Sequence, residues 1–126
     1  MIVQFSIENY LSFKEQNTLS MVATSLREET LLTENVLMPV GDTDISLLKS
    51  ALILGPNASG KSNVIKAFAF FKRFIINSFK NMQAGEEIGV ENYRLDAWSA
   101  SEPTSFELIF ISGDNQFPYG FTVTRD

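Results

Sequence analysis

The chain has 126 residues, a net charge of −5, 44% hydrophobic residues and eleven phenylalanines, which is the size and apolar content of one globular domain and excludes a disordered chain. Because it holds neither cysteine nor histidine, disulfides, thiolate or imidazole metal sites and histidine acid–base chemistry are excluded within these residues. No apolar run approaches the roughly 18 residues of a membrane span, and no signal-peptide pattern opens the chain. We therefore expect a cytoplasmic protein with no membrane partner, and the acidic charge argues against nucleic-acid binding by this segment.

The first elements in chain order are two predicted strands. Residues 2–10 alternate in polarity, with Val3, Phe5 and Ile7 on one face, and residues 19–23 repeat the alternation. The polar stretch 12–17 between them has the length of a hairpin connection. The pattern predicts an N-terminal antiparallel ribbon.

A long connection and a buried strand are predicted next. Residues 25–46 carry mixed charge, proline and glycine, with a short strand or turn expected near 36–38. Residues 47–54 become almost continuously apolar, which is typical of a central strand covered on both faces.

The segment that follows fits the pattern G-x-x-x-x-G-K-[ST], in which a glycine-rich loop exposes N–H groups to phosphate and a helix begins at the anion. Its residues are Gly55, Pro56, Asn57, Ala58, Ser59, Gly60, Lys61 and Ser62. A predicted strand precedes this loop and a helical pattern follows it, so the context agrees with a P-loop. The alternative is a turn that matches the pattern without binding phosphate.

Each key position of this loop has a physical role. Gly55 allows a sharp turn, and Gly60 allows a backbone approach that a Cβ would block. Lys61 is the candidate catalytic residue, because its ammonium would reach the β- and γ-phosphate oxygens, and the Ser62 hydroxyl is the expected Mg²⁺ ligand. The predicted cofactors are ATP and Mg²⁺.

A long helix is predicted from Ser62 to about Met82, because apolar residues recur there at spacings of three and four. Residues 83–85 supply a stop. Five of the ten basic residues lie in the predicted P-loop or along this helix, and a solvated helix face is favoured over a DNA-facing stripe. They are Lys61, Lys66, Lys72, Arg73 and Lys80.

The last third predicts a β-hairpin. Residues 106–111 and 117–124 alternate in polarity around the turn-forming stretch 112–116, and residues 93–95 are a candidate for one more short strand. The stretch 111–116 faintly resembles an L-S-G-G-Q signature, but a hairpin turn is the preferred interpretation.

The stretch Asn9-Tyr10-Leu11-Ser12-Phe13-Lys14, followed by the loop Gly55 to Ser62 and then Asn63, resembles the N-terminal half of SMC/RecF-type ATPase heads. The stretch from Pro103 to Tyr119 is similar to the AAA-like ATPases of the OLD and abortive-infection group, which serve phage defence. The resemblance covers most of the chain. It implies an α/β fold of the P-loop NTPase type, an ABC-ATPase-like N-terminal lobe whose mixed sheet carries an antiparallel ribbon, a hairpin and one long helix.

The resemblance also implies site residues. Residues 55–62, with Asn63 after them, would bind ATP phosphates and Mg²⁺, and the loop 12–14 would lie near the nucleotide. Where many relatives carry a basic residue before Ser12, this chain has Leu11, and Lys14 is the candidate replacement.

No aliphatic run ending in Asp-Glu occurs in the sequence, and no convincing signature motif either. We therefore expect residues 1–126 to be the N-terminal part of a longer ATPase that dimerises on ATP and couples hydrolysis to a nuclease or DNA-linked effector. Alone, this segment is expected to bind nucleotide without efficient hydrolysis. The alternatives are a non-catalytic protein-interaction module on a P-loop scaffold and an ABC transporter subunit. Base preference, effector and oligomeric state are left open.

Overall fold

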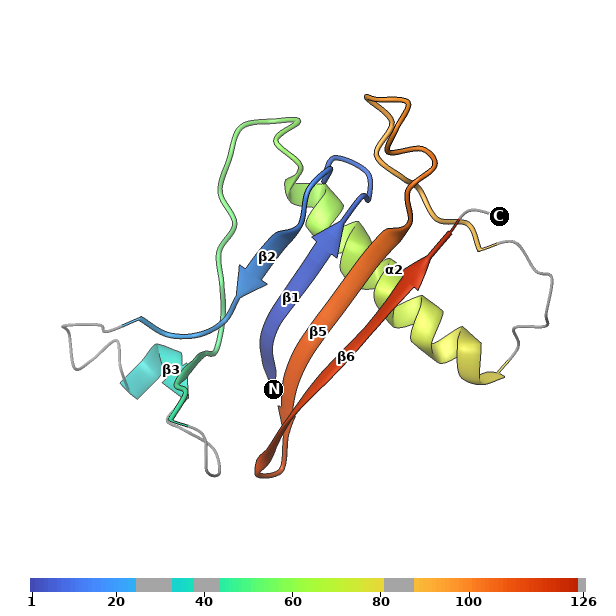
Figure 1. Ribbon diagram of the computed structural model, residues 1–126. Helices are drawn as coiled ribbons and strands as arrows, with labels where there is room; N and C mark the ends of the chain where they lie inside the picture. The colour runs from blue at the N-terminus through green and yellow to red at the C-terminus, as the bar shows by residue number, and fades with distance from the viewer. Residues whose placement is uncertain (25–32, 38–43, 81–87, 125–126) are drawn as a thin grey trace. The chain divides into compact units, whose positions relative to one another are not determined.

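A computed structural model describes residues 1–24, 33–37, 44–80 and 88–124 (Figure 1). A four-stranded sheet has the order β2-β1-β5-β6, and β3 pairs with β4 in a separate two-stranded antiparallel sheet. One long helix, α2, follows β4. The element bounds are β1 Ile2–Glu8, β2 Asn17–Ser20, β3 Val36–Leu37, β4 Leu47–Leu48, α2 Lys61–Lys80, β5 Thr104–Ser112 and β6 Asn115–Val123.

The chain divides into two compact units. The first contains Met1–Ser6, Thr18–Ile53 and Glu107–Gly120, and the second contains Ile7–Asn17, Leu54–Phe106 and Phe121–Asp126. In the first unit, Val3, Leu47 and Ile111 form a small apolar core. The Met1 amino group donates to the Ile111 carbonyl at 2.6 Å, and the Ile111 N–H donates to the Met1 carbonyl at 2.7 Å. Because these two residues exchange both hydrogen bonds, the start of β1 lies beside the end of β5 and the two strands are antiparallel.

The N-terminal ribbon is confirmed. Val3, Phe5 and Ile7 are all buried, as their alternation predicts. The chain reverses at Leu11–Ser12, because Tyr10 and Phe13 exchange backbone hydrogen bonds of 2.9 and 2.8 Å. The turn is therefore tighter than the predicted 12–17 connection, and β2 does not begin until Asn17.

The core of the second unit is aromatic. Helix α2 carries Ala67, Phe70 and Phe71 on one buried face, which matches the helical spacing in the sequence. The Phe106 ring on β5 lies 5.3 Å from the Phe70 ring and 5.2 Å from the Tyr10 ring, centroid to centroid. The first pair of rings is stacked and the second meets edge to face, which are both favourable arrangements of aromatic rings. The predicted helix is confirmed to Lys80; Met82 and the stop at 83–85 lie outside the described residues.

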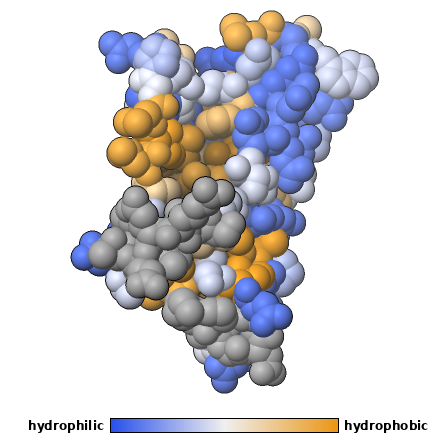
Figure 2. Space-filling view, turned by 90° about the vertical axis from the view of Figure 1, so that its left-hand side faces the viewer, coloured by the Kyte–Doolittle hydropathy of each residue, from blue (hydrophilic) through white to orange (hydrophobic). Residues whose placement is uncertain are grey.

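The predicted strand over 47–54 is wrong beyond its first residues. Leu47 and Leu48 pair with β3, but residues 51–54 have no regular structure, and Leu52 and Leu54 are each 81% exposed. A strand needs backbone partners on a neighbouring strand, and no described segment supplies them here. The apolar composition of residues 51–54 predicted that they would be buried, but in the described part of the chain they are exposed. Figure 2 shows apolar side chains at the surface on the face that it views.

The C-terminal hairpin is confirmed. Strands β5 and β6 are joined by a turn at Gly113–Asp114, where Gly113 has a φ of 61°. The stretch 111–116 is therefore a hairpin turn and its two strand ends. Residues 93–95 form no strand, so that prediction is wrong. In the described residues, no helix is long and apolar enough to cross a membrane.

Replacing Phe106 with alanine should destabilise the protein by about 3–5 kcal/mol, because its ring is 2% exposed at the centre of the aromatic core. Urea unfolding followed by circular dichroism measures this. The matched control is Phe117→Ala on the adjoining strand, where the side chain is 43% exposed and a loss below about 1 kcal/mol is expected. Equal losses in the two variants would contradict this account of the core.

Candidate functional site

The conformation of the loop 55–60 depends most on Gly60. A Cβ on Gly60 would lie 2.8 Å from Ser12 Oγ, and Gly60 has a φ of +89°, in the left-handed region. A Cβ on Gly55 would lie 2.7 Å from Ser59 Oγ. Because Ser59 Oγ ends a side chain that can rotate away, the backbone constraint lies at Gly60, whose φ favours glycine.

Helix α2 begins at Lys61, directly after the loop. The N–H groups of Asn63 and Val64 both donate to the Gly60 carbonyl, at 3.0 and 3.4 Å. In the described part of the chain, none of the backbone hydrogen bonds of this turn and helix start is donated by the N–H groups of Gly60, Lys61 or Ser62. Unpaired N–H groups at a helix start, with the positive end of the helix dipole behind them, are able to bind an anion.

The Lys61 side chain folds back over the loop. Its Nζ donates to the carbonyls of Gly55 and Pro56, each at 2.5 Å, and lies 3.4 Å from Ser59 Oγ. The ammonium is thus held at the loop itself. The Ser62 side chain, the predicted Mg²⁺ ligand, is exposed in the first turn of α2.

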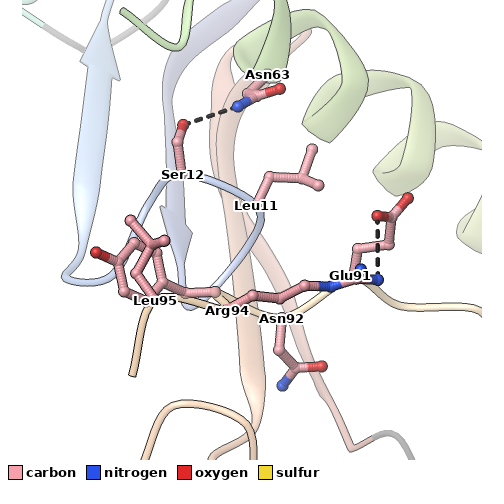
Figure 3. A pocket seen from close by; sticks show the side chains of 8 residues that line it. Leu11, Ser12, Asn63, Glu91, Asn92, Arg94 and Leu95 are labelled. Carbon is pink, nitrogen blue, oxygen red and sulfur yellow. Dashed lines mark hydrogen bonds and ion pairs between the residues drawn. The ribbon is translucent and has the colours of Figure 1, made fainter. Parts of the chain in front are cut away.

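The turn at residues 11–12 contacts the loop and the start of α2. Asn63 Nδ2 donates to Ser12 Oγ at 2.9 Å (Figure 3), and the Leu11 N–H donates to the Glu91 carbonyl, also at 2.9 Å. Ser12 therefore joins the N-terminal turn to the predicted P-loop. That the loop 12–14 contacts nucleotide stays a prediction.

Lys14 has another partner. Its Nζ lies 2.7 Å from Asp96 Oδ2, so this ammonium is directed at Asp96 instead of the loop. The hydrogen bond from Lys14, followed by the Ser99 N–H, lowers the pKa of Asp96 to about 2. The same hydrogen bond and the charge of Asp96 raise the pKa of Lys14.

Asn9 ties the N-terminal turn to the segment 91–104. Its Nδ2 donates to the carbonyls of Ser99, Glu102 and Pro103, and its Oδ1 accepts from the Tyr93 N–H at 3.2 Å. Thr104 Oγ1 donates to the Asn9 carbonyl at 2.7 Å. Asn9 is buried and has a φ of 50°, which asparagine tolerates better than most residues. This role of Asn9 was not predicted from the sequence, where the residue stands only within the stretch 9–14 that resembles ATPase heads.

A cavity of about 390 Å³ opens beside the start of α2. It is lined by Leu11, Ser12, Asn63 and the run Glu91–Leu95 (Figure 3). Glu91 and Arg94 form an ion pair at 3.6 Å on its wall. The place of residues 91–95 in this cavity has no local sequence signal, because Leu11, Ser12 and Asn63, which border the cavity with them, lie far away along the chain. Within the described part of the chain, no group of three histidine, cysteine or acidic side chains is placed to hold a metal ion.

The chain was compared with known proteins. A protein-family profile described as "AAA domain, putative AbiEii toxin, Type IV TA system" matches residues 50–126, which include the whole loop, α2 and the hairpin. No curated protein and no solved structure matches the chain.

Replacing Gly60 with alanine should lower the free energy of unfolding by about 1–2 kcal/mol, because an L-residue is strained at this φ and its Cβ would meet Ser12 Oγ. The control is Gly89→Ala, where a Cβ meets nothing within 4 Å and stability should stay within about 0.5 kcal/mol. Chemical unfolding of both variants provides the comparison. A harmless Gly60→Ala would show that the loop does not hold this conformation.

The Lys14–Asp96 pair should make stability depend on pH at the acid end. The pKa of Asp96 is lower in the folded protein than its unfolded value of 3.8. The contribution of ionised Asp96 to the free energy of unfolding is therefore fully present above about pH 4 and is lost as the pH falls toward 2. Asp96→Asn should therefore flatten the decline of melting temperature across this window. Glu107→Gln, at an exposed carboxylate, is the control and should keep it. If the melting temperature of Asp96→Asn declines toward pH 2 as steeply as that of the wild type, the Lys14–Asp96 pair is not the cause of this pH dependence.

Proposed function

This chain belongs to the family of AAA domains, and from that premise we propose that it binds ATP with Mg²⁺ through the loop Gly55–Ser62. The family itself suggests a nucleotide-binding, ATPase-like function. The observation that carries the proposal is the set of N–H groups at Gly60, Lys61 and Ser62, which donate none of the backbone hydrogen bonds that the described part of the chain forms at this turn and helix start. They lie at the start of α2 beside a lysine, and a phosphate group fits both this charge and these donors.

Lys61 supplies the positive charge that binds the phosphate oxygens of ATP. Its ammonium is held by the carbonyls of Gly55 and Pro56, which are neutral acceptors. A β- or γ-phosphate oxygen is a charged acceptor and forms the stronger hydrogen bond, so bound ATP draws Nζ away from the loop. The loop contacts hold the side chain near the place where the phosphates bind.

Ser62 is the proposed Mg²⁺ ligand. It is exposed in the first turn of α2, and its hydroxyl supplies one oxygen while nucleotide and water supply the rest. The bound ion neutralises charge on the phosphate oxygens. Asn63 borders the same site and completes the proposed set.

The wider role follows the sequence resemblance. We propose that the protein acts within an SMC/RecF- or OLD-like ATPase, forms a homodimer on ATP, and couples hydrolysis to an effector such as a nuclease, with phage defence as the setting. The description of the matching family includes a putative toxin of a toxin–antitoxin system, and this description agrees with the proposed defence role.

A second candidate function is protein interaction. Residues 115–120 of β6 are all exposed, including the rings of Phe117 and Tyr119. A solvent-exposed strand with aromatic residues is suited to bind a partner. If the loop does not respond to phosphate, this is the function that remains.

Lys61→Ala should weaken binding of Mg-ATPγS by about 10- to 100-fold, because a charge-assisted hydrogen bond to phosphate contributes roughly 1.5–3 kcal/mol. Isothermal titration calorimetry measures the affinity. The control is Lys66→Ala, which removes an exposed ammonium one turn further along α2 and should change the affinity by less than about threefold. Equal affinity of wild type and Lys61→Ala would end the proposal that this loop binds phosphate.

A further inference from the structure

We propose that the outer face of α2 binds a partner protein, and that the partner contributes an amphipathic helix whose apolar row is bordered by acidic side chains. The outer face is the set of exposed residues opposite the buried side of α2, namely Ile65, Lys66, Ala69, Lys72, Arg73 and Ile76. It begins beyond the loop Gly55–Ser62, so this inference goes beyond nucleotide binding and does not depend on it.

The outer face is not part of the aromatic core. Ala67, Phe70 and Phe71 are the buried residues of α2. Because an α-helix turns by about 100° per residue, the direction half a turn away from these three side chains falls between Ile65 and Ala69. The Ile65 side chain is 66% exposed. This side of the helix therefore carries apolar surface that the described residues leave uncovered.

The apolar residues of the outer face form a row. At about 100° per residue, Ile65, Ala69 and Ile76 lie within about 40° of one another around the helix axis. The basic residues that border this row are Lys72 on one side and Lys66 with Arg73 on the other. An apolar row of this kind, with charged residues beside it, is the surface on which an amphipathic helix packs.

The composition of the outer face differs from that of a helix face that contacts only water. Isoleucine has a lower helix propensity than leucine, glutamate or lysine, so helix formation does not favour it at an exposed position. Helix α2 contains no acidic residue, so Lys66 and Lys72 have no carboxylate three or four positions away to pair with. Within the described residues neither lysine forms an ion pair. Acidic side chains of a partner would supply these missing charges.

The charge of α2 also excludes other arrangements. Two copies of α2 packed on each other would bring like charges together, which disfavours symmetrical self-pairing. The phosphate backbone of a nucleic acid would leave the apolar row uncovered, and the net charge of −5 opposes its approach. A helix with a leucine row and bordering carboxylates matches both the apolar row and the basic residues.

The probe for this face is a synthetic peptide of about three heptads, with leucine at positions a and d and glutamate at e and g. Fluorescence anisotropy of the labelled peptide measures its binding to the protein. The peptide should bind, and added salt should weaken binding because the bordering charges are exposed. A control peptide with lysine in place of every glutamate should not bind.

Lys66→Glu and Arg73→Glu should each weaken binding of the acidic peptide on the order of tenfold, because each replaces an attraction with a repulsion. The matched control is Lys49→Glu, which makes the same charge change at an exposed position outside α2 and should change the affinity by less than about threefold. Ile65→Ser should weaken binding about fivefold and leave the salt dependence in place, because it removes apolar contact and no charge. Melting temperatures of all variants, measured by circular dichroism, should match that of the wild type.

The proposal is overturned if the acidic peptide does not bind, if the lysine peptide binds equally well, or if Lys66→Glu and Ile65→Ser keep the wild-type affinity. A short DNA duplex that binds more tightly than the acidic peptide would assign the face to nucleic acid instead. Self-association of the wild type in sedimentation experiments, lost in Lys66→Glu, would assign it to a second copy and also overturn the proposal. None of these variants alters the loop Gly55–Ser62, so each of these failures leaves the proposed nucleotide binding standing.

Discussion

The side-chain amide of Asn9 is the contact on which the candidate site depends. Its Nδ2 serves three carbonyls between Ser99 and Pro103, and its Oδ1 takes the Tyr93 N–H, so one buried side chain fixes the 91–104 segment against the N-terminal turn. Aspartate would present an acceptor where three carbonyls need a donor, and asparagine tolerates a φ of 50° better than most residues. The bond to the Ser99 carbonyl is buried, and leaving that carbonyl unpaired would cost about 1–3 kcal/mol. The side chain must therefore both donate and accept, as the amide of Asn9 does.

The Asn9 contact also affects the loop 55–60, which lies far from it along the chain. Asn9 positions the turn that carries Ser12, and Ser12 in turn meets Gly60 and Asn63, so the shape of the loop 55–60 depends on residues some fifty positions earlier. The loop itself is exposed and makes few hydrogen bonds of its own. Segments of this kind lie at the low-stability end of a fold, where binding of a ligand shifts the conformation most easily.

Periodic elements were predictable from sequence, and contacts between distant residues were not. The alternation of Val3, Phe5 and Ile7 and the helical spacing of α2 reflect local geometry, so both were predicted with nearly the observed bounds. The same rules failed at residues 51–54, where apolar composition predicted a strand but no described neighbour pairs with it. They also missed the cavity and the Asn9 contacts, which join residues 84 to 95 positions apart and leave no local pattern. The loop 55–62 could be identified because its motif consists of eight consecutive residues. Its contacts with nucleotide remain predictions.

The position of Lys61 makes phosphate binding depend on a rearrangement of the loop. Its ammonium must first leave the Gly55 and Pro56 carbonyls, so part of the attraction between Lys61 and phosphate is offset by the loss of these two hydrogen bonds. A ligand with several charged oxygens compensates for this loss better than a single phosphate, because each charge-assisted hydrogen bond contributes roughly 1.5–3 kcal/mol. A triphosphate should therefore move Lys61 at a concentration where inorganic phosphate does not.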